Sequence, residues 1–570
     1  MIFELKFTEM KNKINIWAIL LVFVLSVGCS RDKFADLNTD PDAILTIPPE
    51  YELPTGLLAI HGNERYYDLY LGIYYWSQTF SIGSGNAEGS YQASGNIGAR
   101  WGMFYNGVGN RLVDIKEIIK KLPAEKQASY VHLNAIADIP LAYFAWYTSD
   151  VYGSMAYSEA FRARYTTPPL LTPKYDTQEQ LYDILDQQLK SAVERLKAPT
   201  TATQTPLTGY DIYYDGDATK WIKAANSLRL KMAMRLMKRN PTKLRTIAAE
   251  VLGDNVGVIS SDAESWRFIA GNGRTGGDDN PANQRPVSGS KNMVDFMWKT
   301  SDPRIRIYYE PSHFTKERFE AAQEQGKIPA SFAWDGQLYR GQYVSPDASQ
   351  DATKAPYFAA ISYKFNNIDV TGVRLPSSIR PSYFNSTPNN GNMTYPLINL
   401  SDVLFMRAEL AQRGIYGTPA DAQNWYYKGI DAALAEHDKA ASIAKITGYQ
   451  ALTPEEITAY KAKPGVAFTS ANALEQICVQ QYINYFKNNS EAWALIKRTG
   501  YPSLTGNIMK SEEFISSGVT LEMPRRFSIT RPSVTDLNAQ NVNNAIDEMM
   551  KDPEFRNPNE ITGRVWWDMK

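Results

Sequence analysis

The chain has 570 residues and carries 60 Lys and Arg against 61 Asp and Glu, so its net charge is close to zero. This balance argues against a nucleic-acid partner, because phosphate binding usually needs a basic face. The two cysteines and four histidines show no zinc-ligand spacing, and no nucleophile-elbow, zinc-protease or phosphate-loop pattern occurs. We therefore expect no cofactor, no metal and no catalytic residue.

The first predicted element is a short apolar run, residues 14–27. Its fourteen residues are too few to span a bilayer, for which roughly 20 are needed. The run fits the apolar core of a secretory signal. We therefore predict that residues 1–28 form a signal peptide. Met10 is an alternative start, because Glu4 and Glu9 before it are unusual in a signal.

The run ends in SVGC, residues 26–29. A small residue before cysteine is typical of a bacterial lipobox, although Leu25 lies one position further back than usual. We expect lipidation of Cys29, since acyl chains bind membranes with about 0.8 kcal/mol per buried CH₂; the alternative is a plain signal peptide with a chance cysteine. Polar residues 29–50 predict a tether. The other cysteine, Cys478, should be a buried helical residue.

Helical periodicity dominates residues 51–570, which we expect to form one binding domain. Helix starts are marked by side chains that can accept hydrogen bonds from free backbone amides, namely those of Asp176, Asp217, Ser401, Thr418 and Thr453. Several helices form pairs with short connections, as in helical hairpin repeats, but no regular 34-residue period is present.

Strand signals are few, and residues 357–365 are one example. Long loops rich in Gly, Pro, Asn and Ser separate the helices, at 81–96, 257–295, 325–356, 366–395 and 500–540. The pattern predicts a mainly α fold with long irregular loops and a few short strands. In such folds the loops commonly carry binding residues.

Seven strings, in this order along the chain, resemble segments of the SusD/RagB family of nutrient-binding lipoproteins. They are FADLNTDPDA after Cys29, SDVYGSMAYSEA (149–160), PKYDTQEQLYDILDQQL (173–189), GDATKWIKAANSLRLKMAMR (216–235), LINLSDVLFMRAELAQRG (397–414), QQYINYFKNNSEAWALIKRTGYP (480–502), and PRRFSIT (524–530) with a final WWD (566–568). Ala156 and Leu410 depart from the usual residues, Pro and Ala. The strings run from Cys29 nearly to the last residue.

The resemblance implies a scaffold of tetratricopeptide-like helical hairpins and a lipid-anchored protein on the outer face of the outer membrane. It also implies a partner, a SusC-like TonB-dependent transporter, to which this protein delivers captured glycan or peptide without catalysis. We interpret residues of these strings as scaffold rather than binding site: Arg229 and Arg235 as parts of buried hydrogen-bonded networks, and Trp493 and Arg498 as parts of a fixed helix-to-loop junction.

Aromatic loop residues are the better binding candidates, because Trp and Tyr stack on the apolar faces of sugar rings while polar side chains bond to the hydroxyls. The candidates fall in two regions, where the family's ligand sites also roughly fall: Tyr91, Gln92 and Asn96 in the first loop, and Trp334, Asp335, Tyr339, Arg340 and Tyr343 in the middle of the chain. Trp101 lies in a helical segment and should be core.

Three functions remain open from the sequence. Glycan binding at the cell surface leads, and RagB-like relatives suggest peptides instead. A surface glycosidase needs only two suitably spaced carboxylates, which sequence does not exclude. The third is a helical-repeat scaffold that binds only proteins.

Overall fold

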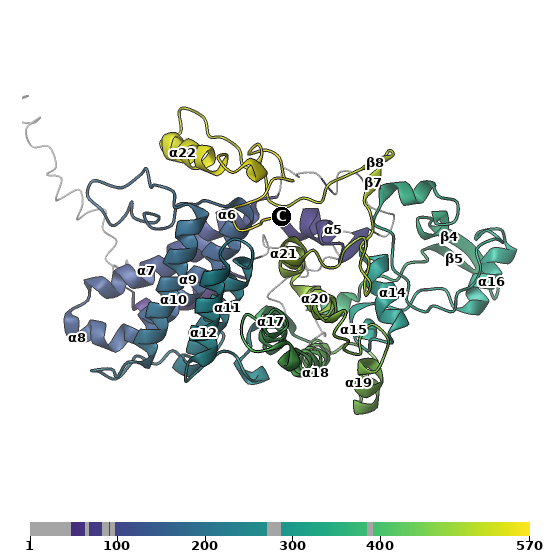
Figure 1. The fold of residues 1–570 in the computed structure, drawn as a ribbon, viewed down its shortest axis with the longest axis horizontal. Helices are drawn as coiled ribbons and strands as arrows, with labels where there is room; N and C mark the ends of the chain where they lie inside the picture. The colour runs from purple at the N-terminus through teal and green to yellow at the C-terminus, as the bar shows by residue number, and fades with distance from the viewer. Residues whose placement is uncertain (1–46, 63–67, 83–90, 92–96, 271–286, 385–390) are drawn as a thin grey trace, which may run out of the picture. The chain divides into compact units, whose positions relative to one another are not determined.

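The computed structural model describes residues 47–62, 68–82, 91, 97–270, 287–384 and 391–570 (Figure 1). Contacts along the chain separate Met1–Pro48 from Pro49–Lys570, and the second unit holds the described helices and strands. The predicted signal peptide, Cys29 and the tether up to residue 46 lie outside the described residues and stay predictions, as do Gln92 and Asn96.

Helices dominate the described part of the chain, as predicted. They are α3 Glu52–Ala59, α5 Tyr74–Trp76, α6 Ala99–Met103, α7 Gly109–Lys121, α8 Ala124–Gln127, α9 Val131–Tyr152, α10 Gln178–Lys197, α11 Ala218–Arg235, α12 Pro241–Gly253, α14 Lys291–Lys299, α15 Ile305–Tyr308, α16 Lys316–Glu324, α17 Leu400–Gln412, α18 Pro419–Ile443, α19 Pro454–Lys461, α20 Ala473–Asn484, α21 Asn489–Thr499 and α22 Ala539–Met549.

The strands pair in antiparallel twos, β1 with β3, β2 with β6, β4 with β5 and β7 with β8. Their bounds are β1 Phe80–Ile82, β2 Trp266–Ala270, β3 Val287–Gly289, β4 Ile361–Phe365, β5 Ile368–Val373, β6 Met393–Ile398, β7 Ile515–Ser516 and β8 Val519–Thr520. The strand expected at 357–365 begins only at Ile361, because Ala355–Tyr357 form a 3-10 turn that buries Tyr357. The mainly α fold with a few short strands is confirmed.

Successive helices pack against each other as the hairpin pattern predicts. Contacts join α9 to α10, α10 to α11 and α11 to α12, and α17 runs along α18 (Figure 1). One large apolar core is built on α7 and α9–α12, and a second on α14, α15, α18, α20 and α21. Cys478 on α20 is fully buried in the second core, as expected, and forms no disulfide.

Three of the expected helix starts are confirmed. Asp217 accepts the backbone N–H of Lys220 at 3.1 Å and begins α11. Thr418 and Thr453 each precede a proline at the first helical position and form reciprocal capping boxes at the starts of α18 and α19. The local sequence therefore determines these three boundaries.

Two expected helix starts are wrong. Thr177, not Asp176, caps α10, because the Asp176 carboxylate instead accepts two backbone N–H groups of the preceding turn, at residues 157 and 158. Asn399, not Ser401, caps α17, since the Ser401 hydroxyl is buried and donates to Glu436 at 2.5 Å. In both cases tertiary contacts displaced the cap by one or two residues.

The family-like strings meet in a buried polar network. Arg235 of α11 donates to Asp150 of α9 at 3.2 Å and to Glu491 of α21 at 2.7 Å. The Glu491 carboxylate also lies 3.6 Å from Lys231, which pairs with Asp402 of α17 at 3.3 Å. Four of the seven strings thus supply one buried cluster of two cations and three carboxylates, which supports the structural interpretation of Arg235.

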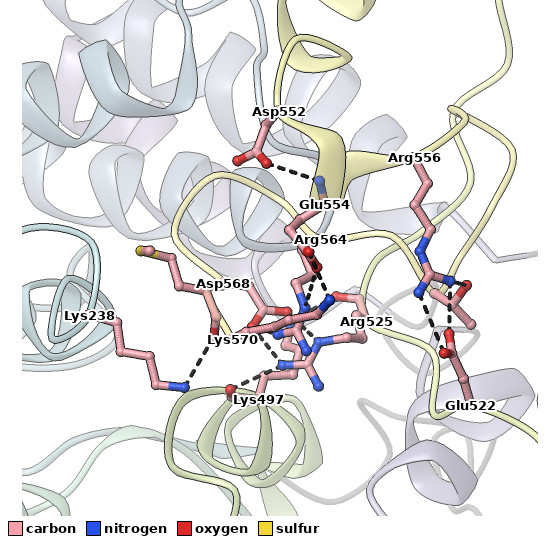
Figure 2. A network of polar contacts seen from close by, with 12 residues as sticks. Lys238, Lys497, Glu522, Arg525, Asp552, Glu554, Arg556, Arg564, Asp568 and Lys570 are labelled. Carbon is pink, nitrogen blue, oxygen red and sulfur yellow. Dashed lines mark hydrogen bonds and ion pairs between the residues drawn. The ribbon is translucent and has the colours of Figure 1, made fainter.

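The C-terminal strings, 524–530 and 566–568, are joined by a second polar network, which Figure 2 shows in close-up. We call this network the clamp. The buried Asp568 carboxylate accepts two hydrogen bonds from Arg525, at 2.6 and 2.7 Å, and one from Arg564 at 2.9 Å. Arg525 also donates to the carbonyl of Lys497 at 3.1 Å. The end of the chain is thereby fixed to α21.

Candidate functional site

Three of the predicted binding residues pack on one another. The guanidinium carbon of Arg340 lies 4.5 Å from the centre of the Trp334 ring, and its Nη2 pairs with Asp335. Trp334 also packs against Phe319 of α16, with ring centres 5.4 Å apart. Arg340 is only 1% exposed. This geometry favours a packing role for the trio, and the prediction that it binds a ligand stays a prediction.

Tyr339 lies apart from that trio. It is half-buried and lines a polar hollow of about 370 Å³ together with Arg306, Arg380 and Tyr449. Both arginines are already paired, Arg306 with Glu456 at 2.7 and 2.9 Å, and Arg380 with a glutamate at 2.9 Å. The hollow therefore offers two tyrosine rings and two arginines whose charges are balanced by glutamates.

Tyr91, the described candidate of the first loop, is packed rather than open. It is 7% exposed, and its ring stacks on Phe514 with centres 3.7 Å apart and planes 13° apart. Its hydroxyl accepts a hydrogen bond from Gln78 at 3.3 Å. Burial raises the pKa of Tyr91 well above its ordinary value, so the hydroxyl stays protonated.

Glu512 connects the two regions in which binding residues were predicted. The backbone N–H of Glu512 donates to the Gln78 side chain at 2.9 Å, and that side chain donates back to the Glu512 carbonyl at 2.6 Å. The Glu512 carboxylate accepts the backbone N–H groups of Val344 and Ser345 at 2.8 and 3.0 Å. The neighbourhoods of Tyr91 and Tyr343, far apart in sequence, are therefore joined in space.

Tyr343 is the predicted residue with the most site-like surroundings. We define the Tyr343 cluster by the side chains that surround its half-buried ring, which are those of Lys291, Asp295, Lys354, Tyr357 and Phe358. Tyr357 meets the ring edge-on at 5.2 Å, and Phe358 lies nearly parallel at 6.5 Å. The ammonium nitrogens of Lys291 and Lys354 are each 5.4 Å from the ring centre.

The charges of the cluster are partly balanced within it. Lys291 donates to one oxygen of Asp295, four residues on along α14, at 2.5 Å. The other oxygen, Oδ1, is buried without a hydrogen-bond partner in the described part of the chain. Burial raises the pKa of this carboxyl, although Lys291 opposes the shift. Burial likewise raises the pKa of Tyr343 to about 12, so the phenol remains a neutral donor.

Such a cluster can recognise a ligand that is apolar on one face and polar at its edges. Aromatic rings provide the flat contact, ammonium groups donate to hydroxyl or carboxylate oxygens, and Ser81 ties the backbone of Tyr343 to the end of β1 at 3.1 Å. The cluster therefore lies where β1 leads into the first predicted loop.

Sequence reasoning missed five of the six cluster residues. Tyr357 and Phe358 were assigned to a strand that begins later, at Ile361. The i, i+4 spacing of Lys291 and Asp295 on one helix face was an available signal for a mutual pair. Lys354 carried no local signal, because only the fold brings it to Tyr343.

The described residues offer neither a metal site nor a membrane-spanning helix. In the described part of the chain, no group of three His, Cys, Asp or Glu side chains could hold a metal ion. Across the same residues, no helix is both long enough and apolar enough to cross a bilayer.

Comparisons with known proteins agree with this architecture. The profile of a SusD-like family, described as "Starch-binding associating with outer membrane", matches residues 61–528. No functionally curated protein matches the chain. Among solved structures, a chitin-binding protein is 22% identical, with a TM-score of 0.64 over 92% of this chain and 100% of its own.

Two further structures are similar to the same extent. A chitin-binding SusD homologue from Flavobacterium johnsoniae is 21% identical, with a TM-score of 0.60 over 92% of this chain and 98% of its own. A SusD homologue from Bacteroides fragilis is 20% identical, with a TM-score of 0.64 over 92% and 100%. At these identities the likeness shows the fold. Because the family profile covers most of its length, the chain belongs to the SusD/RagB family.

Proposed function

We propose that this protein is a non-catalytic receptor that binds a glycan at the Tyr343 cluster. The observation that carries the proposal is the half-buried Tyr343 ring beside Phe358, with the ammonium nitrogens of Lys291 and Lys354 over the ring, each 5.4 Å from its centre. Sugar rings present C–H faces to aromatic rings and hydroxyls to polar side chains. The starch-binding description of the family and the two chitin-binding neighbours support this ligand class.

The proposal includes the location of the receptor. After removal of residues 1–28, acyl chains on Cys29 hold the protein to the outer face of the outer membrane, and residues 29–50 act as a tether for the domain 51–570. The partner is a SusC-like TonB-dependent transporter. Capture directly above a pore raises the effective ligand concentration at its entrance without any chemistry.

The carboxylates near the Tyr343 ring do not favour catalysis. Glycoside hydrolysis needs two carboxyl groups across the scissile bond. In the Tyr343 cluster, Asp295 is engaged by Lys291, and the nearby Glu512 carboxylate is occupied by two backbone amides. Asp295 is thus the single carboxylate of the Tyr343 cluster, and Glu512 is held by the backbone, so the cluster offers no pair of open carboxylates and binding without turnover is the expected outcome.

A peptide ligand of the RagB type is the alternative. The observation that favours it is the pair of ammonium groups beside Tyr343, which suits a peptide carboxylate as well as a sugar hydroxyl. A surface glycosidase is less well supported, for the reason given above.

Calorimetric titration tests the site. The panel contains oligosaccharides of chitin, starch, cellulose and mannan, together with short peptides. We expect at least one oligosaccharide to bind, and Tyr343→Ala to weaken that binding at least tenfold, about 1.4 kcal/mol. Tyr51→Ala is the matched control, since Tyr51 is also a tyrosine, is 52% exposed and does not belong to the Tyr343 cluster. Equal affinity in wild type and Tyr343→Ala would place the site elsewhere, and binding of peptides alone would favour the alternative.

Metabolic labelling tests the anchor and the partner. Radiolabelled palmitate should enter the wild-type protein but not a Cys29→Ser variant. Affinity purification of the wild type from solubilised outer membranes should recover a TonB-dependent barrel. Palmitate-free protein in the cytosol would contradict the location, and recovery of other partners only would favour a scaffold role.

A further inference from the structure

A second hollow lies beneath α22, in a different part of the fold from the Tyr343 cluster. Its volume is about 250 Å³, and it is lined by the aromatic residues Trp101, Tyr152 and Tyr175, by residues 154 and 528–530, and by α22. It shares Ser154 and Met549 with a neighbouring hollow of about 140 Å³. We call the two together the α22 cleft.

The aromatic wall is a stacked group of rings. The Tyr175 ring lies nearly parallel to Trp101, with planes 23° apart and centres separated by 6.3 Å. Tyr152 meets Trp101 edge-on at 5.2 Å. Trp101 was expected to be core from its helical setting, but it is only half-buried and lines the hollow. The wall therefore presents indole and phenol surface to the cleft.

Hydroxyl groups without partners accompany these rings. The side-chain hydroxyls of Ser154, Tyr175, Ser528 and Thr530 make no hydrogen bond to any other described residue, and none is sealed from solvent. Ser154 is 5% exposed and lines both hollows of the cleft. Tyr175 and Ser528 are half-buried and Thr530 is exposed, so their hydroxyls are open to water or to a ligand.

The opposite wall is the apolar face of α22. Val542, Ala545, Ile546 and Met549 recur at three- and four-residue spacing and line the hollow. The start of α22 is held mainly by two side-chain amides. Asn538 donates to the Pro173 carbonyl at 3.0 Å and Asn541 to the Thr172 carbonyl at 2.9 Å. The apolar face of α22 thus forms one wall of the cleft.

We propose that the α22 cleft is a second saccharide-binding site, which takes a single sugar ring against Trp101 and Tyr175. Its volume is below the roughly 300–1,000 Å³ of pockets for drug-sized ligands, so one ring fits and a longer chain extends into the adjoining hollow. The apolar wall and the ring stack match a C–H face, and the four unpaired hydroxyls match the hydroxyl edge of a sugar.

The proposal does not depend on where the principal ligand binds, and only the choice of sugars as probes rests on the proposed function. Once one site has bound a long glycan, binding of the same glycan at the second site is an intramolecular step. The consequence is avidity for polymers beyond the affinity of either site.

Saturation-transfer NMR tests the cleft directly, because it detects weak binding. The probes are the methyl glycosides of glucose, N-acetylglucosamine, galactose and mannose. In a Tyr343→Ala background we expect a signal from at least one probe. Adding Tyr175→Ala should reduce that signal at least fivefold, Tyr175→Phe and Thr530→Val should each reduce it in part, and Tyr51→Ala should leave it unchanged.

Two results would overturn the proposal: no probe gives a signal in the Tyr343→Ala background, or the signal is equal in the Tyr343→Ala and Tyr343→Ala/Tyr175→Ala proteins. Circular dichroism and the unfolding midpoint establish that each variant is folded, and Thr530→Val keeps the test open if Tyr175→Ala is not. Failure of the proposed function is a separate result, because it appears in the calorimetric titration as equal oligosaccharide affinity in wild type and Tyr343→Ala.

Discussion

Replacing Glu409 by Gln should destabilise the fold strongly at neutral pH. Glu409 of α17 is fully buried and accepts two hydrogen bonds from Arg498 of α21, at 2.5 and 2.7 Å. Arg413 adds a third at 3.0 Å. The pair joins two of the family-like strings, 397–414 and 480–502, so the variant tests whether those strings act as scaffold.

The magnitude follows from the pKa of Glu409. Burial raises that pKa, but the charge and hydrogen bonds of Arg498 more than compensate and hold it at about 2, compared with 4.5 ordinarily. At 1.36 kcal/mol per pKa unit, the difference is about 3 kcal/mol. Because the folded pKa is depressed, this stability is complete above about pH 4.5 and is lost as pH falls toward 2. Less than half of it, about 1.4 kcal/mol, remains at pH 3.

Urea unfolding of wild type and Glu409→Gln, followed by circular dichroism, measures the effect. At pH 7 we expect the variant to lose about 3–5 kcal/mol, since Arg498 stays buried with no charged partner from α17. At pH 3 the difference in unfolding free energy between the two proteins should be smaller. Glu320→Gln is the control, because Glu320 and its partner Lys316 are more than half exposed and should matter little. Equal unfolding free energies at pH 7, or a larger difference at pH 3 than at pH 7, would refute the reasoning.

Three further predictions follow from the packing. Trp334→Ala should lower the unfolding free energy by about 2 kcal/mol, because the ring packs between Phe319 and Arg340; an unchanged thermal midpoint would contradict that. Burial raises the pKa of Cys478 to about 12, so iodoacetamide should label the Cys478 peptide only after denaturation, and rapid native labelling would show the core is open. Asp568→Asn should cost about 3 kcal/mol and expose the C-terminal segment to protease, because Arg525 and Arg564 lose their shared carboxylate; an unaltered digestion pattern would count against the clamp.

The helical scaffold could be predicted where local signals were sufficient. Asp217, Thr418 and Thr453 cap their helices because each needs only an amide three residues away. Asp176 and Ser401 fail as caps because their oxygens bond to residues outside the helix. A single sequence does not reveal which of two neighbouring polar residues has the better long-range partner.

The candidate site was predictable only in outline. Aromatic content and loop position indicated Tyr343, but its partners arrive from α14, from residues 354–358 and, through Glu512, from the loop before β7. The same reasoning selected Trp334, whose ring is covered by Arg340. Whether an aromatic loop residue is open or covered depends on tertiary packing, which local pattern does not encode.

A structure of the protein with a bound oligosaccharide, taken from the titration panel, would test the central proposal most directly. The account predicts a sugar ring in contact with the Tyr343 ring, with its hydroxyls within hydrogen-bond distance of Lys291 or Lys354. A sugar bound only elsewhere, with Tyr343 unoccupied at saturating ligand, would contradict it.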